Sequence, residues 1–138
     1  MMIKKIVVLA PVKLNLNLIV LNKDLDGYHF LKTHICFLNF CDKIYLSKDS
    51  ENSINQLNKK SKFKLSKDTL LLKSFKLFTE RYGIINHFKI DFTKNIPIGA
   101  GLGGGSAAAG ALLLGLRFWY NNNYSNKITY ENILDIGF

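Results

Sequence analysis

Residues that mark disulfide-rich or metal-binding proteins are scarce in this sequence. The two cysteines are Cys36 and Cys41, and the three histidines are His29, His34 and His87. Neither set has the spacing of metal ligands, and the cysteines do not form a Cys-x-x-Cys motif. We therefore expect no metal centre and two free thiols.

Arginine and acidic residues are also scarce. Arg81 and Arg117 are the only arginines among 19 basic residues, and ten acidic residues leave a formal net charge of +9. This charge favours an anionic partner such as a nucleotide, a nucleic acid or a lipid surface. Because bidentate recognition of bases depends largely on arginine, we expect no specific nucleic-acid binding. A non-catalytic basic module that binds nucleotide or RNA through the lysines between Lys59 and Lys76 remains an alternative.

Long hydrophobic runs are absent. The run from Ala107 to Leu116 is ended by Arg117 and is too short to cross a membrane. The apolar residues Ile6 to Ala10 follow two lysines, as in a signal peptide, but Pro11 ends the run early. We interpret that segment as a buried first strand and expect a cytoplasmic protein without membrane association.

The apolar content is sufficient for one folded domain. Of the 138 residues 48% are hydrophobic and 21% are charged, which is typical of a globular protein and argues against disorder. A chain of this length can bury a substantial core. We therefore expect residues 1–138 to form a single domain.

Alternation of apolar and polar residues predicts a strand near the N-terminus. Leucines alternate with polar residues from Leu14 to Leu18. Because alternate side chains of a strand point to the same side, Lys13, Asn15 and Asn17 are expected to share one face. That face is either a solvated surface or part of a site.

Turn-forming residues divide the segment that follows. Clusters of Asn, Asp and Gly predict turns at Asn22–Gly27 and Asn39–Asp42, and the second turn is expected to connect strands of a meander or hairpin. The polar residues from Asp49 to Lys67 predict a solvated loop or sheet edge. The hairpin strands are expected at Tyr28–Phe40 and Lys43–Ser47.

Helical spacing appears in the second half of the chain. Apolar residues recur every three or four positions from Leu71 to Tyr82, which predicts an amphipathic helix ending at Gly83. Ser66 or Asp68 is the expected N-cap. Further elements are a strand at His87–Phe92 and helices at Ser106–Tyr120 and from Thr129 to Phe138. The pattern predicts an α+β fold, a mixed sheet with helices packed on one side.

The most informative segment runs from Gly99 to Ser106 and contains five glycines. Glycine backbone lets amide groups approach an anion closely, and a helix N-terminus favours negative charge. The order strand, glycine loop, helix therefore predicts a phosphate-binding site. Gly110 and Gly115 in the following helix each cost roughly 1 kcal/mol relative to alanine, which suggests that the helix packs closely against a neighbour.

Other glycine motifs fit this loop poorly. A P-loop requires a lysine after its glycines, and none follows here. Gly99, Gly101 and Gly104 match G-x-G-x-x-G, but Pro97 interrupts the connection to the strand and no acidic residue follows about twenty positions later. The signatures of protein kinases are missing. A flexible linker would not be flanked so tightly by Ile96-Pro97-Ile98 and an apolar helix.

Three motifs in order resemble one known family. Residues Pro97 to Ser106 resemble the phosphate-binding motif of GHMP kinases, in the triple-glycine form of the diphosphocytidyl-methylerythritol kinases. Ala10 to Leu16 resembles the first strand of that branch, A-P-A-K-[IL]-N-L, and Asp26 to His29 matches its D-G-Y-H. The resemblance implies an N-terminal GHMP kinase domain with a left-handed β-α-β crossover, which is an exception to the usual handedness.

The resemblance also implies an activity and a set of site residues. Such kinases phosphorylate a hydroxyl of 4-diphosphocytidyl-2-C-methyl-D-erythritol with ATP, in non-mevalonate isoprenoid synthesis, and Mg²⁺ is expected to accompany the ATP. Lys13 would lie beside the reacting hydroxyl, and Asn15 would hold the substrate. Tyr28 would stack on the cytosine, and His29 would bond its edge. The residues assigned to ATP are Pro97, Gly99, Gly101, Leu102, Gly103, Gly104, Gly105 and Ser106.

The sequence departs from the family pattern in two places. Ala107 and Ala108 follow Ser106, where the family often has Ser or Ala followed by Asp or Asn, so one polar contact near the phosphates is missing. The family's catalytic Asp lies in a Gly-Ala-Asp-[Val/Ile]-Pro segment that this sequence lacks, and Asp135 belongs to the preceding helix pattern. We expect a truncated domain that folds marginally and has little kinase activity alone, with a complementary C-terminal fragment as a candidate partner.

Overall fold

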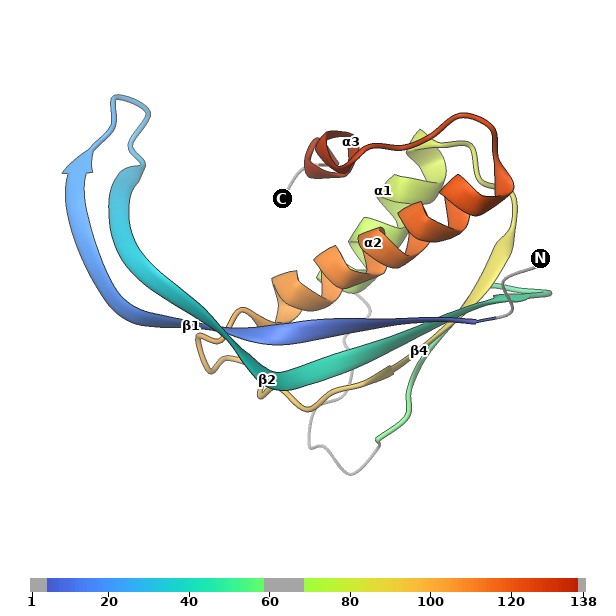
Figure 1. Ribbon diagram of the computed structural model, residues 1–138, viewed down its shortest axis with the longest axis horizontal. Coiled ribbons are helices and arrows are strands. Elements are labelled where there is room, and N and C mark those ends of the chain that lie inside the picture. Colours follow the sequence, from blue (N-terminus) through green and yellow to red (C-terminus); the bar gives the residue numbers. More distant parts are fainter. Residues whose placement is uncertain (1–4, 59–68, 137–138) are drawn as a thin grey trace.

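The computed structural model describes residues 5–58 and 69–136, which form one mixed sheet covered on one face by helices (Figure 1). The strand order is β1-β2-β4-β3. The strands are β1 (Ile6–Lys23), β2 (His29–Asp49), β3 (Ser53–Gln56) and β4 (His87–Thr93), and the helices are α1 (Leu70–Arg81), α2 (Gly104–Asn123) and α3 (Tyr130–Leu134). The expected α+β architecture, with a mixed sheet and helices on one side, is confirmed.

Strands β1 and β2 form a long antiparallel hairpin whose outer half projects as an arm beyond the helices (Figure 1). The turn expected at Asn39–Asp42 is wrong, because β2 continues through it. The pairing instead slips there: Pro11 pairs with Cys41 and Val12 with Leu38, so two residues of β2 are left over. Asp42 is not in a solvated turn but is buried in the sheet.

A second irregularity corrects the predicted polar face of β1. Asn15 pairs with Ile35 and Asn17 with His34, so Leu16 is an extra residue in a β-bulge. Because His34 and Ile35 are consecutive, they point to opposite faces, and so do their partners. Asn15 therefore shares a face with Lys13, while Asn17 lies on the other. There its side-chain oxygen accepts a hydrogen bond from the backbone N–H of His34.

The second half of the sheet is built by a crossover through α1. The polar segment expected to be a solvated loop or sheet edge contains the short edge strand β3, which pairs with β4 in parallel. Helix α1 lies between β3 and β4 in sequence. The handedness of this connection stays a prediction. The lysines from Lys59 to Lys67 lie outside the described residues, as do Ser66 and Asp68. The cap is Thr69, whose hydroxyl accepts from the Leu72 N–H.

The core lies between the sheet and the two longer helices. Strand β4 buries Phe88, Ile90 and Phe92 and exposes or half-exposes the residues between them, as its alternation predicts. Phe88 meets Phe75 of α1 and Trp119 of α2 edge to face. Among the described residues no helix has both the length and the apolar character needed to span a membrane.

Helix α2 lies close to β1 because Gly115 has no side chain. A Cβ added there would lie 3.0 Å from Cγ2 of Val8, which is tighter than ordinary van der Waals contact. The packing demand expected at Gly115 is thus present. The same expectation is wrong for Gly110, where an added Cβ would meet nothing within 4 Å.

This contrast predicts unequal effects of the same substitution at Gly110 and at Gly115. Gly110→Ala should raise the free energy of unfolding by up to about 1 kcal/mol, because alanine favours helix and the space is open. Gly115→Ala should lose most of that gain, and Gly115→Leu should cost about 1–3 kcal/mol through overpacking against Val8. Urea unfolding of the three variants measures these effects. Equal stabilisation by both alanines would contradict close packing of α2.

Candidate functional site

The glycine loop forms a tight set of turns at the start of α2. Gly99, Gly101 and Gly103 have φ angles of 77°, 70° and 66°, a left-handed conformation that costs other residues energy. Gly103 is the N-cap of α2, and no side chain there makes a capping hydrogen bond. The N-termini of α1 and α3 are capped by Thr69 and Thr129. The first amides of α2 thus remain available to an anionic ligand.

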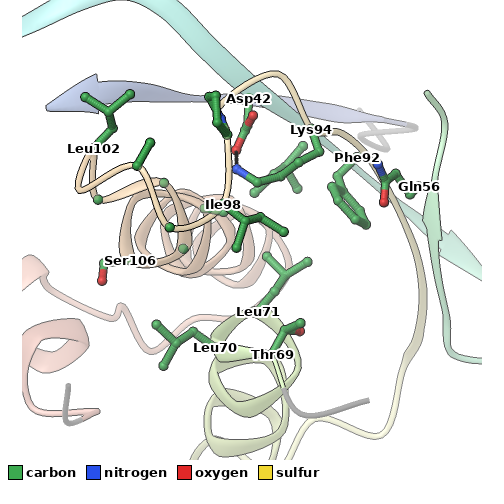
Figure 2. A pocket seen from close by; sticks show the side chains of 18 of the residues that line it. Asp42, Gln56, Thr69, Leu70, Leu71, Phe92, Lys94, Ile98, Leu102 and Ser106 are labelled. Atoms are coloured by element: carbon green, nitrogen blue, oxygen red, sulfur yellow. Dashed lines mark hydrogen bonds and ion pairs between the residues drawn. The ribbon is translucent and has the colours of Figure 1, made fainter. Parts of the chain in front are cut away.

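A cavity of about 400 Å³ adjoins this loop (Figure 2). One wall is the glycine loop and the first turn of α2, and all eight residues that the sequence assigned to ATP line it. The rest of the lining is largely apolar and comes from the start of α1, from β4 and from the segment just before Gly99. Its residues include Leu70, Leu71, Phe92 and Ile98. This is the size and character of a small-molecule site.

The base of the loop is packed without a gap. Gly104 is buried, and a Cβ placed on it would lie 2.8 Å from Cγ2 of Ile96 and 3.0 Å from Nζ of Lys94. Such a short approach requires glycine. The Lys94 ammonium forms an ion pair with the buried Asp42, which also lines the cavity (Figure 2).

Lys13 reaches the loop from β1. Its side chain is half-buried, and its Cε would lie 3.9 Å from a Cβ on Gly103. The structure therefore brings this predicted catalytic lysine to the N-cap of α2. Asn15, two residues further along the same face, is exposed.

Tyr28 and His29 lie at the far end of the arm. Tyr28 is 77% exposed and closes the turn at Asp24, whose backbone N–H donates to the Tyr28 carbonyl. His29 pairs with Lys23, ten residues beyond Lys13, or about 33 Å along the strand. Within the described part of the chain, neither side chain lies near the glycine loop.

Asp135 is not near the cavity. It follows α3, and its carboxylate lies 3.9 Å from the Arg81 guanidinium, at the end of α1 opposite to Leu70. The two ends of α1 are about 16 Å apart. Within residues 5–58 and 69–136, no group of three or more His, Cys, Asp or Glu is arranged to hold a metal ion.

Sequence reasoning missed the apolar wall and the polar residues at the base of the loop. The sequence pattern places Leu71 in an amphipathic helix, Phe92 in a strand and Asp42 in a turn, and none of these patterns indicates a ligand site. Their common feature is contact with residues distant in sequence. The one local signal was Lys94, a charged residue just before the tightly packed Ile96-Pro97.

Comparison with protein families and curated relatives gives one consistent result. Residues 69–138 match the family described as GHMP kinases N terminal domain. A 4-diphosphocytidyl-2-C-methyl-D-erythritol kinase of Clostridium botulinum is 38% identical over 130 residues, covering 93% of this chain and 45% of that protein. One from Francisella philomiragia is 41% identical over 116 residues, or 83% and 42% of the two chains. The chain spans about half the length of the curated relatives it matches.

Solved structures agree. The crystal structure of a 4-(cytidine 5'-diphospho)-2C-methyl-D-erythritol kinase superposes with a TM-score of 0.70 at 27% identity, covering 96% of this chain and 46% of that one. A homoserine kinase from Cytophaga hutchinsonii shares the fold, with a TM-score of 0.64 at 19% identity. The family match extends over half of the chain and includes the glycine loop and α2. This chain belongs to the GHMP kinase family.

Proposed function

We propose that this chain is the nucleotide-binding half of a kinase that transfers a phosphoryl group from ATP to a hydroxyl of 4-diphosphocytidyl-2-C-methyl-D-erythritol. The observation that carries the proposal is the glycine loop, which places the N-terminus of α2 at a cavity of about 400 Å³ without a side-chain cap. Its location in a chain 38% identical to such a kinase supports the substrate assignment.

The loop supplies what a polyphosphate needs. Consecutive glycines expose backbone N–H groups, and the N-terminus of α2 adds a partial positive charge of about half an elementary charge. Phosphoryl transfer depends mainly on positioning and on stabilising the charge of the transferred group. Amides fixed in a rigid loop do both, because they need not reorganise during the reaction.

Lys13 would contribute a side-chain cation beside the N-cap of α2, where its Cε lies against Gly103. We assign its ammonium to the edge of the phosphate seat, beside the attacking hydroxyl. Asn15 on the same face of β1 would hold that substrate by hydrogen bonds. Mg²⁺ would enter with ATP, and the exposed Ser106 hydroxyl in the first turn of α2 is the protein group available to it.

Tyr28 and His29 would bind the cytidine at the end of the arm. An exposed aromatic ring followed by an imidazole can stack on a base and hydrogen-bond its edge. The diphosphocytidyl substrate is shorter than the roughly 33 Å of strand between Lys13 and His29. The assignment therefore requires the arm to bend toward the glycine loop, in the direction of the curvature that it has in Figure 1.

Two observations support a second polypeptide segment as partner. The chain spans 45% of its Clostridium botulinum relative. The arm also exposes many large apolar side chains, more than an isolated domain usually leaves in water. They include Leu16, Leu18, Ile19, Val20, Phe30, Leu31, Ile35 and Phe37.

The nucleotide assignment is tested by two alanine variants with the same backbone strain. Gly101 and Gly83 both have positive φ, 70° and 59°, and an added Cβ meets nothing within 4 Å at either. Each variant should lose about 1–2 kcal/mol of stability. Only Gly101→Ala should weaken MgATP binding, by tenfold or more in calorimetric titration, because it reorients amides of the phosphate seat.

The result also separates a kinase domain from a basic nucleic-acid module. For a nucleic-acid module, the affinity for RNA should fall steeply with salt concentration and should be the same in Gly101→Ala as in the wild type. Absence of ATP binding at millimolar nucleotide, or equal loss of affinity in both variants, would contradict the proposal.

The role of Tyr28 predicts a selective loss of cytidine affinity. Tyr28→Ala should weaken CDP binding by roughly tenfold, since stacking of a base on an aromatic ring contributes about 1–3 kcal/mol. Phe37→Ala removes a ring that is 70% exposed on the same arm and should leave CDP affinity unchanged. Both variants should keep wild-type MgATP affinity. Fluorescence titration distinguishes them, and equal effects on CDP would rule out stacking by Tyr28.

The partner proposal predicts activity only in a mixture. This chain alone should not phosphorylate the diphosphocytidyl substrate, whereas mixing it with the separately produced C-terminal half of the Clostridium botulinum kinase should give ATP-dependent phosphorylation. The same mixture prepared with Gly101→Ala is the control and should be at least tenfold slower. Robust phosphorylation by this chain alone would refute the need for a second segment.

A further inference from the structure

The carboxylate of Asp42 is buried in the sheet, where an unpaired charge is strongly unfavourable. Asp42 is 1% exposed. It lies in β2 just after the point where the pairing with β1 is shifted by two residues. Buried carboxylates persist in proteins when they are paired and hydrogen-bonded. The groups that donate hydrogen bonds to the Asp42 carboxylate therefore show which part of the chain Asp42 holds in place.

Within the described part of the chain, its donors come from the first three residues after β4, on the way to the glycine loop. Asp42 Oδ1 accepts from the backbone N–H of Asn95 at 2.6 Å and from that of Ile96 at 2.8 Å. Oδ2 pairs with the ammonium of Lys94. Charge-assisted bonds of this kind are about twice as strong as neutral ones.

The same connection is held from its other side. Asn58 accepts from the Lys94 N–H at 2.9 Å, and its amide donates to the Lys94 carbonyl at 2.8 Å. The Asn95 side chain donates to the Cys41 carbonyl at 2.8 Å. Residues 94–96 are thus fixed to β2 and to the segment after β3 without belonging to a strand.

Residues 94–96 also pack directly against the first residue of α2. A Cβ on Gly104 would lie 2.8 Å from Ile96 and 3.0 Å from the Lys94 ammonium. A shift of residues 94–96 by even a few tenths of an ångström would therefore change the packing under the first residue of α2. The amides of the loop and of that first turn would move with it.

We propose that Asp42 is a positioning residue for the phosphate seat. By holding the three donors of residues 94–96, it fixes the glycine loop in its binding geometry before nucleotide arrives. Asp42 acts through the loop and does not itself contact phosphate. The inference rests on the proposed nucleotide function, and its readouts are chosen to separate the two.

The test compares the same substitution at two aspartates of the 138-residue chain. Asp42→Asn keeps the size of the side chain but replaces the charged acceptors and directs an amide toward Lys94. Asp91→Asn is the matched control, because Asp91 lies on β4 of the same sheet and also pairs with a lysine, Lys89 at 3.5 Å. Amide hydrogen exchange reports the loop, and titration with inorganic tripolyphosphate reports the seat.

Asp42→Asn should speed exchange at Ile96 and at residues 101–105 by tenfold or more relative to residues 88–92 of β4. It should weaken tripolyphosphate binding at least tenfold. Asp91→Asn should change neither quantity more than twofold. Uniform acceleration across the sheet, or loop exchange within twofold of wild type, would overturn the proposal, because a merely stabilising residue has no selective effect on the loop.

Two further outcomes concern the loss of nucleotide binding and the loss of folding. If wild type binds neither tripolyphosphate nor ATP, the nucleotide function fails, while selective exchange in Asp42→Asn still establishes control of the loop. If Asp42→Asn does not fold, the double variant with Lys94→Met leaves no unpaired buried charge and should fold. In the double variant, amide exchange in the glycine loop should still rise at least threefold relative to β4. Unchanged loop exchange in that variant would overturn the proposal.

Discussion

The close approach of helix α2 to the sheet is the constraint on which the rest of the structure depends. No side chain separates the helix from its neighbours at Gly115, which lies against Val8, or at Gly104, which lies against Ile96. Two points of contact, at the first residue of the helix and just past its middle, fix the direction of the axis. The N-terminus of α2 is thereby placed at one edge of the sheet, where the connection from β4 arrives. The glycine loop can be short and tight because both of its ends are held by the packed core.

The electrostatics of the site follow from what this arrangement leaves unpaired. Helices α1 and α3 each have an N-cap threonine whose hydroxyl accepts from one amide of the first turn, whereas the N-cap of α2 is Gly103, which has no side chain to do so. The positive end of the helix dipole therefore faces the cavity. Lys13 adds a cation on one side of the loop. The charge of Lys94 is already compensated by Asp42, so that lysine shapes the seat and contributes little net potential.

The described residues divide into a packed body and an extended arm. The body contains the helices, the inner halves of the long strands and the cavity, and its core is continuous from Ala10 to Ile136. The arm has strand pairing but little burial, and Tyr28 and His29 lie at its end. A two-stranded ribbon is only marginally stable without packing. The GHMP kinase fold thus combines a packed body, which includes the glycine loop, with an extended arm that buries few of its own side chains.

The sequence by itself determined the elements whose signals are local. The alternation in β4, the helical spacing of α1 and the glycine content of residues 99–106 each depend on neighbours within a few positions, and all three led to the observed structures. Only the tertiary structure decided the position of Asp42, the faces of Asn15 and Asn17, and the apolar wall that includes Phe92. Asp42 resembles a turn residue because its stabilising partner, Lys94, lies 52 residues away. A bulge of one residue reversed the face of Asn17, because strand side chains alternate and any insertion changes their side. Such features depend on contacts that form only when distant segments pack together.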